Sequence, residues 1–312
     1  MKTIFLLTLL LTFQVPGLAQ FFSGEISYTV KIIPKIKNLN VDSILNQQPG
    51  TTSVYAITNG FYKSTYFKNG EVTYSYTYHG DTKRMYDEVA GKDYISFRDS
   101  RKGKTSRIRS IIYPDSTKVI LGQKCFLVER VYEGYISKTY YALDLKIDPE
   151  SFSSHLVGDW YNQIKEVKGS VSMTSINEYT THFEINEVTK LTARPLKPEY
   201  FALPDKLIVA SESALDKGVA LAQLSKETIE CYRHKMTAGL KDVPLNEFRS
   251  YIILIVSANG DLKYMEPYEK DKHELYKVAM TIISGCGINF IPGQIAGKNV
   301  DTLVYFPVDF SK

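Results

Sequence analysis

A succession of short segments that alternate apolar and polar residues, separated by turn residues, is what most limits the fold of this chain. Residues 61–67 and 71–78 flank Asn69-Gly70, a dipeptide typical of two-residue hairpins because both of its positions tolerate positive φ. Similar segments follow at intervals of about 8–12 residues as far as Leu207. Tyrosine, which favours strands, occurs 23 times. Residues 23–208 therefore predict a meander of about ten antiparallel strands in a curved sheet, a barrel or a sandwich.

Residues 246–312 predict a smaller unit that combines strands with one helix. Two strand-like runs flank Asn259-Gly260, and a last alternating run ends at Phe310. Between them lies an amphipathic helix with apolar residues at i, i+3, i+4 and i+7, namely Leu275, Val278, Ala279 and Ile282. The order strand, strand, helix, strand describes a compact ββαβ unit. The whole chain is therefore expected to be α+β and mostly β.

The stretch between these regions, 209–245, has a different composition. Three prolines close the strand-rich region: Pro195, Pro198 and Pro204. Beyond them, apolar residues stand roughly in helical register: Leu215, Val219, Leu224 and Ile229. We therefore expect a helical connector over 209–245.

The N-terminus has the three parts of a secretory signal peptide. Lys2 provides a positive charge, residues 4–15 form an apolar core, and Gly17-Leu18-Ala19 supplies small residues for cleavage. We expect a signal peptide over 1–19, cut after Ala19, with an uncleaved anchor as the alternative. The apolar run is shorter than the roughly 20 residues of a membrane span. The mature protein is therefore expected to be exported and to have no transmembrane span.

Three cysteines, Cys125, Cys231 and Cys286, leave one thiol over if a disulfide forms. An exported compartment permits disulfides, and we favour a bond between Cys231 and Cys286 in the C-terminal third. The alternative is three free, buried thiols that behave as small apolar side chains.

The formal net charge of +4 is too small to imply a polyanionic partner. One basic run stands out, consisting of Arg98, Arg101, Lys102, Lys104, Arg107 and Arg109. It would suit anionic lipid headgroups or glycan phosphates, but a solvated loop between strands is the favoured interpretation. Nucleic acid is not expected as a partner, because the chain is exported and the run lies in no known nucleic-acid-binding motif.

The sequence contains no recognisable catalytic or cofactor motif. The five histidines lie outside hydrolase, zinc-protease and kinase patterns, and no glycine-rich phosphate loop is present. Cys231-x-x-His234 would be half of a metal site, but no second ligand pair accompanies it. We therefore expect a protein that is not an enzyme and that holds neither a cofactor nor a metal.

The C-terminal region resembles the TonB C-terminal domain family. The resemblance covers about 246–312 and lies in Pro292-Gly293, Gly297-Lys298, Val300 and the closing run Phe306-Pro307-Val308-Asp309-Phe310. It implies binding of a protein partner, such as an outer-membrane receptor segment, by β-strand addition at a sheet edge. The residues expected at that edge are Val300, Thr302, Val304, Phe306, Val308 and Phe310. The alternative is that this unit only packs on the N-terminal region as a structural cap.

Residues 23–208 resemble the GLPGLI-type family of exported Gram-negative proteins, whose function is uncharacterised. Gly122-Gln123-Lys124-Cys125 and Phe201-Ala202-Leu203-Pro204 carry this match. It implies an open, half-barrel-like curved sheet, similar to that of lipoprotein carriers. The second functional hypothesis is therefore a carrier of a lipid or another apolar ligand in the N-terminal sheet. The C-terminal resemblance favours a periplasmic location, with the cell exterior as the alternative.

Overall fold

The computed structural model describes residues 21–103, 105–240, 247–271 and 273–311, so the expected signal peptide lies outside the described residues. The first eleven strands are β1 (Gly24–Pro34), β2 (Thr52–Thr58), β3 (Phe61–Lys68), β4 (Glu71–His79), β5 (Arg84–Val89), β6 (Tyr94–Asp99), β7 (Arg107–Ile120), β8 (Gln123–Tyr132), β9 (Tyr135–Lys146), β10 (Ser170–Tyr179) and β11 (His182–Ala193). The later strands are β12 (Leu207–Ser211), β13 (Ala220–Leu221), β14 (Glu247–Val256), β15 (Leu262–Pro267), β16 (Phe290–Ile291), β17 (Gly293–Ile295), β18 (Lys298–Val300) and β19 (Thr302–Ser311). The α-helices are α1 (Val41–Gln47), α2 (Trp160–Glu166), α3 (Lys226–Leu240) and α4 (Leu275–Gly285).

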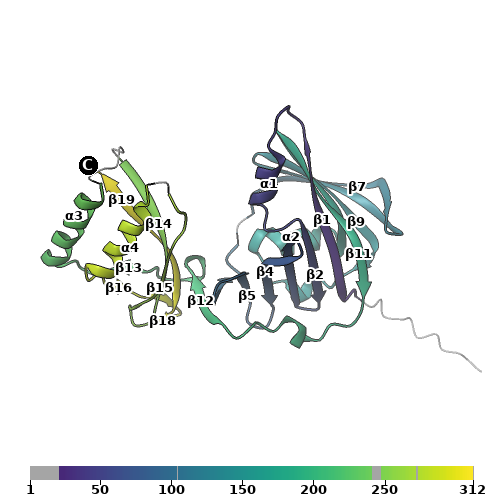
Figure 1. Ribbon diagram of the computed structural model, residues 1–312. Coiled ribbons are helices and arrows are strands. Elements are labelled where there is room, and N and C mark those ends of the chain that lie inside the picture. The colour runs from purple at the N-terminus through teal and green to yellow at the C-terminus, as the bar shows by residue number, and fades with distance from the viewer. Residues whose placement is uncertain (1–20, 104, 241–246, 272, 312) are drawn as a thin grey trace, which may run out of the picture.

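Fifteen of these strands form one mixed sheet, in the order β15-β14-β19-β12-β6-β5-β4-β3-β2-β1-β11-β10-β9-β8-β7 (Figure 1). The prediction of a mostly β chain is confirmed. β12 is parallel to both β6 and β19 and so joins the strands of the N-terminal and C-terminal regions in this one sheet. Among the described residues, no helix is long and apolar enough to cross a membrane.

Local sequence explains the hairpins and two of the helices. Asn69 and Gly70 have φ of 53° and 84° and join β3 to β4, as their turn preference requires. Asn40 begins α1 by accepting a hydrogen bond from the amide of Ser43 at 2.9 Å. In α4, Leu275, Ala279 and Ile282 are buried at the positions that the periodicity predicted.

The expected helical connector over 209–245 is only partly helical. The helix begins at Lys226, whereas residues 207–211 form β12 and residues 220–221 form β13, which pairs with β16. Leu215 and Val219 therefore lie outside any α-helix. The sequence argument failed here because long-range strand pairing outweighed a weak helical composition.

The two largest clusters of buried apolar side chains in the described residues lie on the N-terminal and the C-terminal part of the sheet. In the N-terminal part, α2 packs Trp160 and Ile164 against a cluster that includes Ile26, Tyr62 and Tyr78 and also draws residues from β7 to β11. In the C-terminal part, α4 covers one face of β14, β15 and β19, and its buried side chains meet those of β14 and β19. The order β14, β15, α4, β19 places short strands β16, β17 and β18 between the helix and the last strand.

Side chains on both faces of β12 join the two parts. Val209 packs on one face with Ile255, and Ala210 packs on the other face with Phe97. Both Val209 and Ala210 are fully buried. The mixed sheet is therefore continuous in its packing as well as in its strand order.

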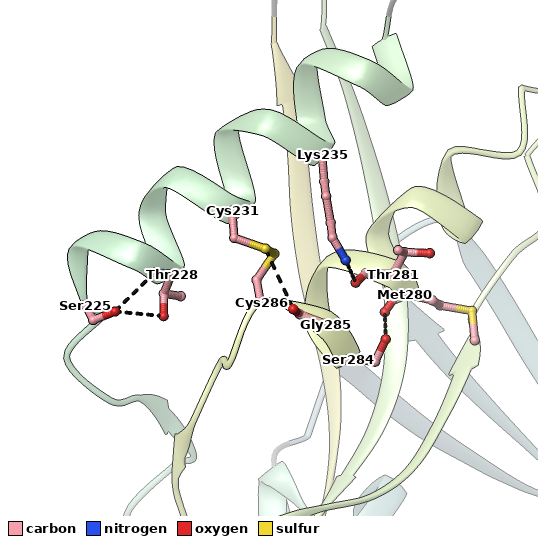
Figure 2. The surroundings of a disulfide bond; sticks show 9 residues. All are labelled: Ser225, Thr228, Cys231, Lys235, Met280, Thr281, Ser284, Gly285 and Cys286. Atoms are coloured by element: carbon pink, nitrogen blue, oxygen red, sulfur yellow. Dashed lines mark hydrogen bonds between the residues drawn. A yellow bond between two sulfur atoms is a disulfide. The ribbon is translucent and has the colours of Figure 1, made fainter.

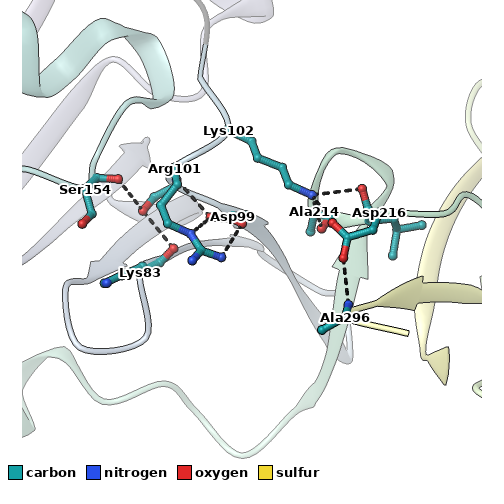
Figure 3. Close-up of polar contacts among 10 residues, drawn as sticks. Lys83, Asp99, Arg101, Lys102, Ser154, Ala214, Asp216 and Ala296 are labelled. Atoms are coloured by element: carbon teal, nitrogen blue, oxygen red, sulfur yellow. Dashed lines mark hydrogen bonds and ion pairs between the residues drawn. The ribbon is translucent and has the colours of Figure 1, made fainter. Parts of the chain in front are cut away.

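A polar contact lies beside this junction (Figure 3). Lys102 Nζ is 2.9 Å from Oδ1 of Asp216, and it also donates to the carbonyls of Ala214 and Leu215. Oδ2 of Asp216 accepts the N–H of Ala296 at 2.7 Å. Asp216 therefore links a loop of the N-terminal part to the turn between β17 and β18.

Candidate functional site

One side of β19 is open for most of its length. β14 pairs with β19 from end to end, whereas β12 reaches only Thr302 and Leu303 on the other side. No strand in the described part of the chain pairs with that side beyond Leu303. We call this side of residues 304–310 the open edge.

The hydrogen-bonding groups at the open edge belong to the odd-numbered residues of β19. The N–H of Ala210 in β12 donates to the carbonyl of Asp301 at 2.8 Å, and the hydroxyl of Tyr232 in α3 donates to the carbonyl of Asp309 at 3.2 Å. Main-chain groups of alternate residues point to the same side of a strand, so the N–H and C=O of Tyr305 also face the open edge. An extended peptide placed there would find donors and acceptors at normal strand spacing.

Pro307 fits this geometry. It lies opposite Tyr251, and the register between β14 and β19 continues through it without a shift. As an odd-numbered residue it would direct an N–H to the open edge, so the missing donor costs nothing in the ladder with β14. Pro307 therefore leaves the ladder with β14 intact. The proline instead removes one donor from the exposed side of the strand.

An apolar groove of about 390 Å³ runs beside the open edge. Its walls come from α3, the end of α4 and β19, and they include Leu224, Ile229 and Phe306. Leu224 and Ile229 are each more than a third exposed. Such a groove gives alternate side chains of an added strand an apolar surface on which to pack.

The disulfide between Cys231 and Cys286 ties α3, which forms one wall of the groove, to the end of α4 (Figure 2). Lys235 Nζ adds a second tie by donating to the carbonyl of Thr281 at 3.0 Å. Because the sulfur of Cys231 is bonded, it is no ligand for a metal beside His234. Among the described residues, no group of His, Cys, Asp and Glu has the geometry of a metal site.

The side chains expected to meet a partner lie mostly in the core. Thr302, Val304, Val308 and Phe310 are buried, Phe306 is half-buried, and Val300 packs in the cluster at β12. The exposed side chains of β19 are those of Tyr305, Pro307 and Asp309. The even-numbered face is buried because its apolar residues pack against α4, so a peptide at the open edge would bond to the main chain of the strand.

The predicted turn motif lies away from the open edge. Pro292 precedes β17, which starts at Gly293, and Lys298 begins β18. Gly297 has φ of 74° in the turn between these strands. A Cβ on Gly293 would lie 2.7 Å from Leu215 Cδ1, so this glycine allows a close approach to the segment after β12. The motif therefore positions a hairpin at the junction.

The basic run is largely paired with acids. Arg98 contacts Asp87, Arg101 contacts Asp99, and Arg107 contacts both Asp159 and Glu166. With Lys102 held by Asp216, these residues form ion pairs within the protein. This arrangement gives no support to a patch for phosphate groups.

A second hollow, of about 230 Å³, lies in the N-terminal part beneath α2. Tyr55 and Tyr76 stand in its wall with Trp160 and Ile164 of α2. Arg130, which is fully buried, holds α2 through two hydrogen bonds to Oε2 of Glu166 at 2.9 and 3.2 Å. The hollow is the place where a small ligand of the N-terminal sheet could lie.

Sequence reasoning missed the groove, whereas it expected a cavity for an apolar ligand in the N-terminal sheet without naming the residues that line it. The groove depends on α3 crossing beside β19, and no local pattern encodes that placement. The N-terminal hollow has a partial signal, because Ser64 stands between Tyr62 and Tyr66 on one face of its strand-like segment. Small residues between large ones on one face leave space once the strands are paired.

Comparisons with known proteins give no family. No family model matches the chain, and no curated protein matches it. Among solved structures, PNGF-II has 10% identity and a TM-score of 0.37, over 93% of this chain and 61% of its own. A DUF1329 family protein from Desulfovibrio piger has 12% identity and a TM-score of 0.21, over 58% of this chain and 90% of its own. Likeness at these TM-scores carries no argument about function, so the site stands on its own geometry.

Proposed function

We propose that this chain is an exported, non-enzymatic protein of the cell envelope whose C-terminal part binds an extended segment of a protein partner. The segment adds as a strand to the open edge of β19 and bonds to the main chain of Tyr305, Pro307 and Asp309. The resemblance to the TonB C-terminal domain makes an outer-membrane receptor segment the favoured partner and the periplasm the favoured location. The disulfide is consistent with an oxidising, exported compartment.

The observation that carries this proposal is the coincidence of the open edge with the apolar groove. Strand addition needs main-chain groups for affinity and pockets for alternate side chains, and β19 offers the first beside the second. The competing interpretation is that α3 covers the edge to prevent aggregation. α3 contacts the main-chain groups of the edge through the hydroxyl of Tyr232, which donates to the carbonyl of Asp309.

Photo-cross-linking from the full chain in cells would identify the partner. A photoreactive residue replaces Leu224 in the groove in one variant and Ile108 in another. Ile108 is 69% exposed on β7, at the other end of the sheet, so it is a control for non-specific capture. We expect Leu224 to cross-link one defined, extended segment that Ile108 does not reach. Equal patterns from both positions would refute the proposal.

Substitution of Asp309 separates main-chain binding from side-chain effects. Asp309→Pro removes the N–H at the open edge and leaves the ladder with β14 in place, as Pro307 already does. Asp309→Ala keeps that N–H but loses the ion pair with Arg249, and so serves as the matched control. For a synthetic peptide of the cross-linked sequence, we expect Asp309→Pro to weaken binding about tenfold and Asp309→Ala to leave it nearly unchanged. Equal losses in calorimetric titrations of the two variants would contradict strand addition.

A carrier of an apolar ligand in the N-terminal sheet is the second candidate function. The hollow beneath α2 supports it, since its walls combine apolar side chains with tyrosines. Its volume lies below the roughly 300–1,000 Å³ of drug-sized ligand sites, so a whole phospholipid does not fit. Mass spectrometry of ligands extracted from the purified protein tests this function.

A further inference from the structure

The hollow beneath α2 owes its space to one small residue in a row of larger ones. Ile26, Tyr55, Ser64 and Tyr76 lie directly opposite one another across β1, β2, β3 and β4. The side chain of Ser64 is too short to fill the gap between its two tyrosine neighbours. Trp160 of α2 stacks on Tyr62, which adjoins Ser64 on the same face, with ring centroids 5.4 Å apart. Rigid aromatic rings therefore frame the space.

The wall combines aliphatic side chains with neutral polar ones, which come from tyrosines, serines, Trp160 and Asn186. The hydroxyl of Tyr28 donates to the carbonyl of Ser172 at 2.7 Å. The hydroxyl of Tyr55, in contrast, is buried and has no acceptor for its proton among the described residues, since the indole N–H of Trp160 can only donate to the hydroxyl oxygen. Buried polar atoms nearly always have a partner, so this hydroxyl lacks one that a ligand could supply.

The absence of charged side chains in the wall limits the kind of ligand that the hollow can bind. No side chain that lines the hollow carries a positive or a negative charge at neutral pH. Burial raises the pKa values of Tyr28, Tyr55 and Tyr76 well above the usual range, so these hydroxyls stay neutral donors. A ligand carboxylate or phosphate would be buried without a counter-charge, which is strongly unfavourable.

We infer that the hollow binds a small neutral apolar molecule with one hydrogen-bond acceptor, such as a ketone or ester oxygen, which accepts from the hydroxyl of Tyr55. The inference rests on the second candidate function and narrows its ligand: free fatty acids and phospholipids are excluded by charge and size. It is independent of peptide binding at β19.

A fluorescence titration of the full chain tests the site. Trp160 is the single tryptophan of the chain and lines the hollow, so its emission reports occupancy directly. The probe is prodan, a neutral naphthyl ketone that accepts energy from tryptophan. We expect saturable quenching of Trp160 at one site. Acetylnaphthalene should displace prodan, whereas naphthoate, of nearly the same shape but anionic, should displace it at least tenfold less well. Absence of saturable quenching, or equal displacement by the two competitors, overturns the inference.

Two substitutions locate the probe. Tyr55→Phe keeps the ring and removes the hydroxyl, so prodan should bind about three- to tenfold more weakly. Ser64→Leu fills the space and should abolish binding. If Ser64→Leu does not fold, as circular dichroism would show, Tyr55→Phe alone decides, and unchanged affinity in that variant refutes the role of the hydroxyl. Because neither residue lies near β19, these outcomes are independent of peptide binding. If the protein binds prodan but no ligand is extracted from the protein purified from cells, the binding site is supported and the carrier function is refuted.

Discussion

At the scale of single residues, His155 shows how the N-terminal core depends on pH. It is 1% exposed, and its Nε2 lies 2.5 Å from the hydroxyl of Tyr62. Burial lowers the pKa of His155 to about 3, and the charge of Arg98 acts in the same direction. Unfolded histidine titrates near 6.5, so between these values only the unfolded chain takes up the proton. The contribution of neutral His155 to the free energy of unfolding is therefore fully present above about pH 6.5. It falls by about 1.4 kcal/mol per pH unit as the pH drops toward 3.

The variant His155→Gln tests this linkage, since glutamine does not titrate. We expect it to be less stable than the wild type at pH 7.5, with a difference that shrinks by about 1 kcal/mol per unit of acidification below pH 6. The free energies of unfolding are measured in urea at about pH 7.5, 6 and 5, which bracket the titration of unfolded histidine. His234, which is exposed on α3, provides the control His234→Gln. A constant difference between His155→Gln and the wild type would contradict a buried, neutral histidine.

At the scale of elements, sequence patterns predicted the elements that depend on neighbouring residues alone, namely tight turns and an amphipathic helix. Asn69-Gly70 makes its hairpin because both residues accept positive φ, and α4 forms because Leu275, Ala279 and Ile282 recur on one face. β12 was missed because it is held by distant strands, β6 and β19, that its own five residues do not encode. The alternation in β19 was recognised, but which face meets the core follows from the position of α4. The open edge and the groove likewise depend on how α3 and β19 are placed.

The disulfide between α3 and α4 is an element-scale device that we expect to support both stability and binding. It closes a loop with a sequence separation of 55, which corresponds to about 4 kcal/mol on the chain-entropy model. The double variant Cys231→Ala/Cys286→Ala should lose stability of this order and also bind the partner peptide more weakly, because α3 forms a wall of the groove. Chemical denaturation and calorimetry measure the two effects. Reducing agent should affect the wild type in the same way and the double variant no further; an unchanged wild type would show that the bond contributes little.

At the scale of the whole molecule, the continuous sheet suggests that the two parts unfold together. Val209 and Ala210 place buried side chains on opposite faces of β12, and each packs with residues from both parts. Further contacts cross the junction, including the ion pair of Lys92 with Glu266 and that of Lys102 with Asp216. A helical tether between two domains would permit independent unfolding, whereas a shared central strand couples them.

Proline substitutions in β12 test this coupling. The N–H of Ala210 donates to Asp301 at the start of β19, whereas the N–H of Leu207 donates to Asp93 beside β6. By this alternation the N–H of Ile208 points toward the side of β19, but the paired register with β19 begins only at Ala210. Ala210→Pro therefore breaks the hydrogen bond to the C-terminal part, whereas Ile208→Pro removes a donor that lies outside the paired register with β19.

The readout uses two probes that cover different parts of the chain. Trp160 emission reports the N-terminal part, because this is the single tryptophan, and far-ultraviolet circular dichroism reports both parts. We expect the two urea transitions to coincide in the wild type and in Ile208→Pro, and to separate in Ala210→Pro as the C-terminal part unfolds first. Separate transitions in the wild type would mean that the two parts are independent. Coincident transitions in Ala210→Pro would mean that side-chain packing across the junction, rather than the hydrogen bond from β12, transmits the coupling.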